Sequence, residues 1–99
     1  MAKYKLTNKA VEDLAEIWEY TFEEWSEQQA DNYYEMLISN CKEIASNPNL
    51  GKAYDGVTKG LIGTRVNRHV IFYRKTDEDY IEIIRILHGR MDLKKRILK

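Results

Sequence analysis

Apolar residues in the first half of the chain recur with the period of an α-helix. Between residues 10 and 25 they follow one another at steps of three or four, which predicts an amphipathic helix with one buried stripe. This stripe consists of Val11, Leu14, Trp18, Phe22 and Trp25. The acidic side chains expected to cover the rest of the helix are Glu12, Asp13, Glu16, Glu19 and Glu23. Thr7 or Asn8 is expected to cap the first turn, because a short side-chain oxygen can accept from a free backbone amide.

A second helix is predicted directly after the first. Ser26 and Gln29 have the spacing of a capping box, in which the two side chains satisfy free amides of the first turn. The apolar stripe that follows consists of Ala30, Tyr33 or Tyr34, Leu37, Cys41, Ile44 and Ala45. Pro48 disfavours helical geometry at the residue before it and ends the helix. Two long helices with almost no linker predict an antiparallel helical hairpin.

The second half of the chain has the pattern of β-strands. Strands are predicted at residues 61–66, 69–75 and 80–87, and a short further strand is predicted at residues 3–6. The last of the three is rich in isoleucine on both faces, so we expect it to lie in the interior of a sheet. Residues 47–60 contain a proline and scattered glycines, which predict a loop.

This order of elements predicts one α+β domain spanning residues 1–99. It begins with an N-terminal strand, continues with the antiparallel two-helix hairpin and ends with a three-strand antiparallel meander. We expect the helices to pack on one face of the twisted, mostly antiparallel sheet, because each element must bury its apolar face against another. A chain of 99 residues is long enough to form an independent core.

Cys41 is the single cysteine, so no disulfide can form within the chain. We interpret it as a small apolar side chain on the buried stripe rather than as a nucleophile. The lack of a disulfide favours a reducing compartment. The N-terminus has no apolar segment of the kind found in signal peptides, and no apolar run approaches the ~20 residues of a membrane span. These features together predict a soluble cytoplasmic protein without a membrane partner.

The net charge is zero, but the charges are distributed unevenly along the chain. Residues 1–50 hold four lysines and ten acidic residues, a net charge of −6. Residues 51–99 hold twelve Lys and Arg and six acidic residues, a net charge of +6. A basic half of this kind favours contact with an anionic partner. The alternative is that the two halves neutralise each other within the fold.

Many cations of the second half lie on the predicted strands or at their ends. They are Arg65, Arg68, His69, Arg74, Arg85, His88 and Arg90. Arginine forks match the oxygens of phosphate, so this cluster suits binding, or metal-free cleavage, of single-stranded RNA. The alternative is that these arginines pair with acids such as Asp55, Glu82 and Asp92. No metal site is expected, because the two histidines do not form a helical pair and there is no second cysteine.

Two stretches, RHVIFYR (residues 68–74) and EIIRILHGRMD (residues 82–92), resemble the C-terminal half of ParE toxins. These toxins belong to the RelE/ParE superfamily of bacterial toxin–antitoxin proteins. The resemblance covers nearly the whole chain, including residues 10–37, 44–55 and 60–74. One departure from the family pattern is Ile62, where many relatives carry a basic residue.

The resemblance implies a toxin that inhibits DNA gyrase, and thereby replication, without a catalytic site or cofactor of its own. It also implies a ParD-type antitoxin that neutralises the toxin, and through which the complex binds operator DNA. RelE relatives instead cut messenger RNA on the ribosome, with Lys and Arg and often a tyrosine near the C-terminus. Here no tyrosine follows Tyr80, which disfavours this alternative, although Arg65, Arg85 and His88 are compatible with it. A third alternative is a binding module without toxicity that only sequesters an antitoxin.

Two surfaces are expected to carry these contacts. The helices carry more large apolar side chains than one face of a small sheet can cover, and the antitoxin is expected to bind the remainder. These candidates are Trp18, Phe22, Trp25, Tyr33, Tyr34 and Leu37. The target is expected to meet the basic end of the sheet, formed or flanked by Arg65, Arg68, His88, Arg90, Met91 and Asp92. The competing interpretation is that Arg85 or Arg90 stabilises the fold through a buried carboxylate.

Overall fold

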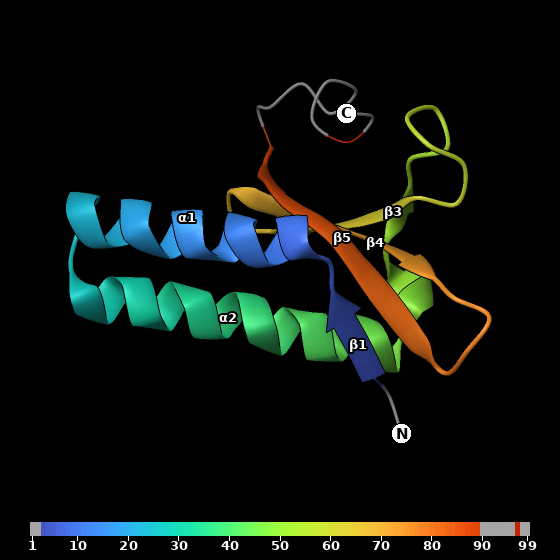
Figure 1. Ribbon diagram of the computed structural model, residues 1–99, viewed down its shortest axis with the longest axis horizontal. Helices are drawn as coiled ribbons and strands as arrows, with labels where there is room; N and C mark the ends of the chain where they lie inside the picture. The colour runs from blue at the N-terminus through green and yellow to red at the C-terminus, as the bar shows by residue number, and fades with distance from the viewer. Residues whose placement is uncertain (1–2, 90–96, 98–99) are drawn as a thin grey trace.

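A five-stranded sheet carries a two-helix hairpin on one of its faces (Figure 1). The computed structural model describes residues 3–89 and residue 97. Along the chain the elements are β1 (Lys3–Leu6), α1 (Asn8–Glu24), α2 (Glu27–Ser46), the 3₁₀ helix η1 (Pro48–Leu50), β2 (Lys52–Ala53), β3 (Ile62–Val66), β4 (His69–Lys75) and β5 (Tyr80–His88). The predicted α+β class, with a helical hairpin followed by a meander, is confirmed.

The strands are ordered β1-β5-β4-β3-β2 across the sheet. β1 runs parallel to β5, and the other neighbouring strands are antiparallel. β5 therefore pairs along both of its edges, as the isoleucines on its two faces predict. The two-residue strand β2 lies in the segment 47–60, for which the sequence predicts a loop. Two residues are too few to produce a recognisable alternation of apolar and polar positions.

Both predicted helix caps are present, and the first also fixes α1 to the sheet. The Ala10 amide donates to Thr7 Oγ1 at 3.1 Å, and the Gln29 amide donates to Ser26 Oγ at 3.1 Å. The Thr7 hydroxyl itself donates to the carbonyl oxygen of Ile84 at 2.7 Å, and the Thr7 amide donates to that of Ile83 at 3.0 Å. One threonine therefore satisfies an amide of α1 and anchors the start of the helix on β5.

The sheet separates two apolar cores. The larger core lies between the sheet and the helices and includes Leu14, Leu37, Cys41, Ile71 and Ile83. The smaller core, formed by side chains on the other face, consists of Leu61, Val70, Phe72 and Leu87, with Tyr54, Val57, Ile84 and Ile97 packed against it. The predicted stripe of α2 is confirmed at its four fully buried positions, which are Ala30, Leu37, Cys41 and Ile44.

The buried face of α1 differs from the predicted stripe. Its buried residues are Ala10, Asp13 and Leu14, whereas the predicted stripe residues Val11, Phe22 and Trp25 are 50%, 46% and 65% exposed. Figure 1 shows the reason for Phe22 and Trp25, because the tip of the hairpin, where α1 ends and α2 begins, projects past the sheet. Aromatic side chains near this tip have the helical period of a buried stripe but no sheet beneath them.

Cys41 lies fully buried in the larger core, and burial raises the pKa of its thiol to about 11. We expect the native thiol to resist Ellman's reagent at neutral pH and to react at once in denaturant, because the thiolate is the reactive form. Cys41→Ser is expected to lower the free energy of unfolding by about 1–3 kcal/mol, since it buries a hydroxyl without a partner. Urea unfolding measures this loss. A native thiol that reacts as fast as free cysteine contradicts the structural role.

Candidate functional site

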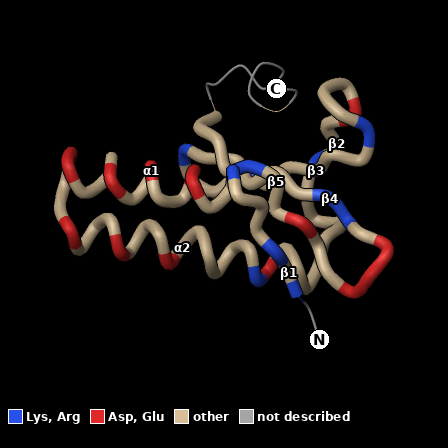
Figure 2. Tube along the Cα trace, in the orientation of Figure 1, with Lys and Arg blue, Asp and Glu red and all other residues tan. Residues whose placement is uncertain are grey.

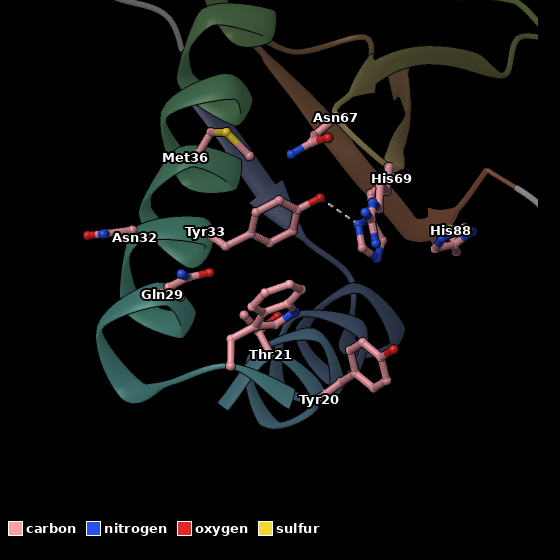
Figure 3. A pocket seen from close by; sticks show the side chains of 11 residues that line it. Tyr20, Thr21, Gln29, Asn32, Tyr33, Met36, Asn67, His69 and His88 are labelled. Carbon is pink, nitrogen blue, oxygen red and sulfur yellow. Dashed lines mark hydrogen bonds between the residues drawn. The ribbon is translucent and has the colours of Figure 1, made fainter. Parts of the chain in front are cut away.

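A pocket of about 600 Å³ lies where the hairpin tip extends past the sheet (Figure 3). The residues that line it come from both helices, from the β3–β4 turn, and from the facing ends of β4 and β5. They are Tyr20, Thr21, Trp25, Gln29, Asn32, Tyr33, Met36, Asn67, Arg68, His69 and His88. Residues far apart in the sequence therefore converge on one hollow.

The β3–β4 turn gives the pocket its sheet-side wall. Val66 pairs with His69, so Asn67 and Arg68 form a two-residue turn between the strands that the sequence predicts at residues 61–66 and 69–75. Asn67 adopts a φ of 57°, in the left-handed region that asparagine tolerates better than most residues. The carbonyl oxygen of Arg68 accepts from the Gly89 amide at 2.9 Å, which fixes the turn against the end of β5.

A hydrogen bond between a tyrosine and a histidine crosses the pocket from helix to sheet. Tyr33 Oη of α2 lies 2.7 Å from His69 Nδ1 of β4 (Figure 3). The His69 ring also contacts the His88 ring edge-on, with 5.4 Å between their centroids, because the two residues are register partners of β4 and β5. Burial raises the pKa of Tyr33, against a smaller opposing effect of the Arg68 backbone hydrogen bond and charge. The tyrosine is therefore a neutral hydroxyl at physiological pH.

His69 is a neutral ring at physiological pH. Burial lowers its pKa to about 4, the charges of His88 and Arg68 act in the same direction, and Asp13 opposes them. A neutral imidazole has one N–H donor and one acceptor nitrogen, so it can bond Tyr33 and still offer a polar atom to a ligand. The pocket therefore contains a histidine that keeps one charge state across the physiological range.

This shift predicts a specific pH dependence of stability. An unfolded chain takes up the His69 proton near the ordinary pKa of 6.5, whereas the folded chain does so near 4. The contribution of His69 to the free energy of unfolding is therefore complete above about pH 6.5 and is lost as the pH falls toward 4. NMR titration of the ring protons checks the midpoint, and His69→Gln should remove this part of the pH profile. A midpoint at or above 6.5 contradicts the assignment.

Arg85 is held by a buried carboxylate on α1. Its Nε and Nη2 donate to the two oxygens of Asp13, both at 2.8 Å, and the Ile86 amide donates to Asp13 Oδ2 at 3.0 Å. The hydrogen bond to Asp13 is the main reason why the pKa of Arg85 is raised. The sequence analysis places Asp13 on the exposed side of α1, and this is wrong. Arg85 therefore pairs with a buried carboxylate, as the competing interpretation expects, and its contribution to stability stays a prediction.

A β-bulge directs Arg85 toward the helix. Phe72 pairs with Arg85 while Tyr73 pairs with Ile83, so Ile84 is an extra residue in β5. Such a bulge interrupts the strict alternation of a strand and re-aims the side chains beside it. Arg85 thereby lies on the same side as Ile86, where Asp13 can reach both its guanidinium and the following amide.

The target-contact candidates lie at one end of the sheet but on two faces. Arg68 and His88 line the pocket on the helix side. Arg65 pairs with Val70 of the smaller core, so strand alternation places it on the opposite face, where its Nε donates to the Asn67 carbonyl at 3.0 Å. The remaining candidates, Arg90, Met91 and Asp92, lie outside the described residues.

The antitoxin-contact candidates do not lie on one continuous surface. Trp18 and Phe22 stack with 5.3 Å between ring centroids, and Trp18 Nε1 donates to Asp31 Oδ1 of α2 at 2.9 Å. Trp25 and Tyr33 instead line the pocket, and Tyr34 is 39% exposed. Leu37 is fully buried, so it packs the larger core and offers no surface in the isolated chain.

Sequence reasoning did not identify this pocket as a site. It did not single out Tyr20, it assigned Gln29 to a helix cap alone, and it did not connect Tyr33 with His69. The one available signal was the polar pair Asn67–Arg68 between two strands, which predicts a tight turn but not what the turn faces.

Within the described part of the chain, no group of three or more His, Cys, Asp or Glu side chains is arranged to hold a metal ion. No helix among residues 3–89 combines the length and apolar character needed to cross a membrane.

Comparison with known proteins gives the family. The model of the family described as the ParE toxin of the type II toxin–antitoxin system parDE matches residues 4–93. Toxin ParE1 of Mycobacterium tuberculosis is 34% identical over 96 residues, which cover 97% of this chain and 98% of that protein.

Two solved structures share the fold. One is a chromosomal ParDE toxin–antitoxin system from P. aeruginosa, with a TM-score of 0.77 and 20% identity over 89% of this chain and 96% of that one. The other is the toxin–antitoxin complex RelBE2 from Mycobacterium tuberculosis, with a TM-score of 0.61 and 19% identity over 88% of this chain and 96% of that one. At such identities these two matches establish the fold alone. The family match and the full-length relative go further, and show that this chain belongs to the ParE toxins of type II toxin–antitoxin systems.

Proposed function

We propose that this toxin arrests growth in the cytoplasm by inhibiting DNA gyrase and that a ParD-type antitoxin neutralises it. The observation that carries the proposal is the family match, which spans residues 4–93 and so includes both the hairpin and the basic end of the sheet. Inhibition without catalysis requires only a surface that binds the target. Arg65 and Arg68 provide charged groups for such a surface at the sheet end.

The antitoxin is proposed to bind the hairpin. Large apolar side chains on α1 remain exposed in the isolated chain, including Val11 at 50% and Phe22 at 46%. An amphipathic antitoxin helix that covers the Trp18–Phe22 stack would remove this apolar surface from water. Figure 2 shows that acidic residues recur along both helices, so basic residues beside the apolar stripe of the antitoxin would complement them. In the complex, the antitoxin is also the part proposed to bind operator DNA.

Replacement of Phe22 by alanine tests the hairpin as the antitoxin surface. We expect the affinity for a co-expressed ParD-type antitoxin to fall about tenfold or more, because aromatic anchors dominate such interfaces. Leu50→Ala is the matched control, since Leu50 is 70% exposed on η1 and lies away from the hairpin tip. Isothermal titration calorimetry measures both variants. Full affinity in both Phe22→Ala and Trp18→Ala would place the antitoxin elsewhere.

A supercoiling assay tests the target. Purified wild-type toxin is expected to inhibit gyrase and to leave ribosome-bound messenger RNA intact, and addition of antitoxin should restore supercoiling. Messenger RNA cleavage with normal supercoiling would reject gyrase as the target. If the toxin leaves both supercoiling and messenger RNA intact but binds the antitoxin tightly, it is a binding module that only sequesters the antitoxin.

The second candidate function is messenger RNA cleavage on the ribosome, as in RelE toxins. One observation favours it, which is the joint placement of Tyr33, His69, His88 and Arg68 around one pocket. Two imidazoles and a guanidinium can supply a proton acceptor, a proton donor and a cation for the phosphorane. A histidine with a pKa of about 4 is a weak base, however, which disfavours this function for His69.

A further inference from the structure

We propose that the pocket between the hairpin tip and the β3–β4 turn binds a nucleotide, with the base against the aromatic wall and the phosphate on Arg68. The nucleotide can be free or part of a single strand, because both present the same base and phosphate. This inference goes beyond the proposed inhibition of gyrase and does not depend on it.

The charge of the pocket suits an anion. Acidic residues recur along both helices of the hairpin (Figure 2), yet none of the described residues that line the pocket is Asp or Glu. Arg68 is exposed and makes no ion pair with any other described residue. Its guanidinium therefore retains its donors for an incoming phosphate, which it can bind through two parallel N–H groups.

A neighbouring carboxylate does not cancel this charge. Asp13 and Glu16 line a second, smaller hollow of about 290 Å³ that shares His69 and His88 with the first. Asp13 is already bound by the Arg85 guanidinium and by the Ile86 amide. The charge of Asp13 is therefore offset by Arg85, and Glu16, which also acts on Arg85, is the remaining carboxylate of this second hollow.

The opposite wall of the pocket suits a base. Tyr20 and Trp25 are 64% and 65% exposed. Two large rings therefore leave apolar surface in water, which a ligand or partner would cover. Figure 3 shows the Gln29 and Asn67 amides on either side of the Tyr33 ring, whereas the Asn32 amide points away. Aromatic faces stack on any base, and side-chain amides offer both donors and acceptors to its edge.

The size of the pocket agrees with this ligand. A volume of about 600 Å³ lies within the ordinary range for small-molecule sites and holds a nucleotide with room to spare. A phosphate ion alone would leave the aromatic wall uncovered. A purely apolar ligand would bury Arg68 and the amides without partners, which costs free energy.

Tryptophan fluorescence tests the proposal, because Trp25 lines the pocket. The full-length toxin is titrated with adenosine 5′-monophosphate, guanosine 5′-monophosphate, adenosine, inorganic phosphate and a short single-stranded oligonucleotide. We expect quenching by the nucleotides, with adenosine and phosphate binding at least about tenfold more weakly, since each offers one half of the contacts. If the oligonucleotide binds more tightly than the mononucleotides, the ligand is a nucleotide within a single strand. If a mononucleotide binds more tightly, the ligand is a free nucleotide.

Variants assign the binding to this pocket. Arg68→Ala, with Arg68→Gln as a second substitution, is expected to weaken nucleotide binding about tenfold or more, through loss of a charge-assisted contact. Arg74→Ala is the control, because Arg74 is an exposed arginine of β4 that pairs with Glu82 away from the pocket. Where a variant differs from the wild type in its intrinsic fluorescence, binding is followed instead by NMR, through the chemical shifts of residues close to Trp25 and His69.

Three outcomes would overturn the proposal. These are no binding of any probe at millimolar concentration, equal affinity for phosphate and nucleotide, and nucleotide affinity that Arg68→Ala and Arg68→Gln leave unchanged. Each is independent of gyrase inhibition, which the supercoiling assay measures in the absence of these probes. A toxin that inhibits gyrase but binds no nucleotide therefore rejects this inference alone.

Discussion

Replacement of Asp13 by alanine is expected to lower the free energy of unfolding by about 3–5 kcal/mol, the loss typical when one partner of a buried ion pair is removed. The side chains of Asp13 and Arg85 are only 7% and 13% exposed, so water cannot replace the lost carboxylate. The Ile86 amide loses its acceptor at the same time. Since domains of this kind are stable by about 5–15 kcal/mol, a large share of the total stability depends on this one side chain.

Urea unfolding measures the effect, and an exposed ion pair serves as the control. Arg74 Nε and Glu82 Oε1 lie 2.9 Å apart, but the two side chains are 57% and 32% exposed, so Glu82→Ala is expected to cost about 1 kcal/mol or less. The double substitution of Asp13→Leu with Arg85→Met is expected to recover much of the loss, because it leaves no charge buried alone. A cost for Asp13→Ala no greater than that for Glu82→Ala would show that this pair is not essential to the fold.

The elements of this fold follow largely from local patterns in the sequence. Ser26 and Gln29 lie at the spacing of a capping box, and the structure places the cap there. The stripe of α2 is predicted correctly at Leu37, Cys41 and Ile44, because these residues share the larger core with residues of the sheet. At these residues the local structural preference agrees with the burial in the fold, and such agreement allows the structure to be predicted from the sequence.

The same reasoning fails on α1 for two physical reasons. Phe22 and Trp25 have the period of a core stripe, but periodicity does not reveal where the sheet ends. Asp13 is polar and so was assigned to the surface, whereas Arg85 makes its burial favourable. That partner lies 72 positions away in the sequence, and the β-bulge at Ile84 that directs it has no sequence signature of its own.

The candidate site depends even more on tertiary structure. The pocket joins the end of α1, the start of α2 and the end of β5, so no local pattern predicts it. Arg68 and His88 were predicted together from their shared position at the basic end, and the structure brings both to the pocket. Arg65 belongs to the same run of cations but lies on the other face, because alternate residues of a strand point in opposite directions.

This separation of Arg65 from Arg68 allows a decisive test of the toxic surface. We expect Arg68→Ala to raise the toxin concentration needed for gyrase inhibition about ten- to a hundredfold, the loss expected for a charge-assisted contact. Its melting temperature should remain that of the wild type, since an exposed arginine that pairs with no acid among the described residues adds little stability. Arg65→Ala, on the opposite face of the same sheet end, is expected to have the smaller effect if the target meets the helix side.

Growth arrest after induction and supercoiling by purified gyrase measure the two variants in parallel, with Arg74→Ala as the control. Loss of inhibition only in Arg68→Ala places the target on the pocket side of the sheet. Loss of inhibition only in Arg65→Ala places the target on the opposite face. Equal losses of inhibition in the two variants mean that the target contacts both faces of the sheet end. If both variants fold normally and remain fully toxic, the basic end of the sheet is not the surface that meets the target.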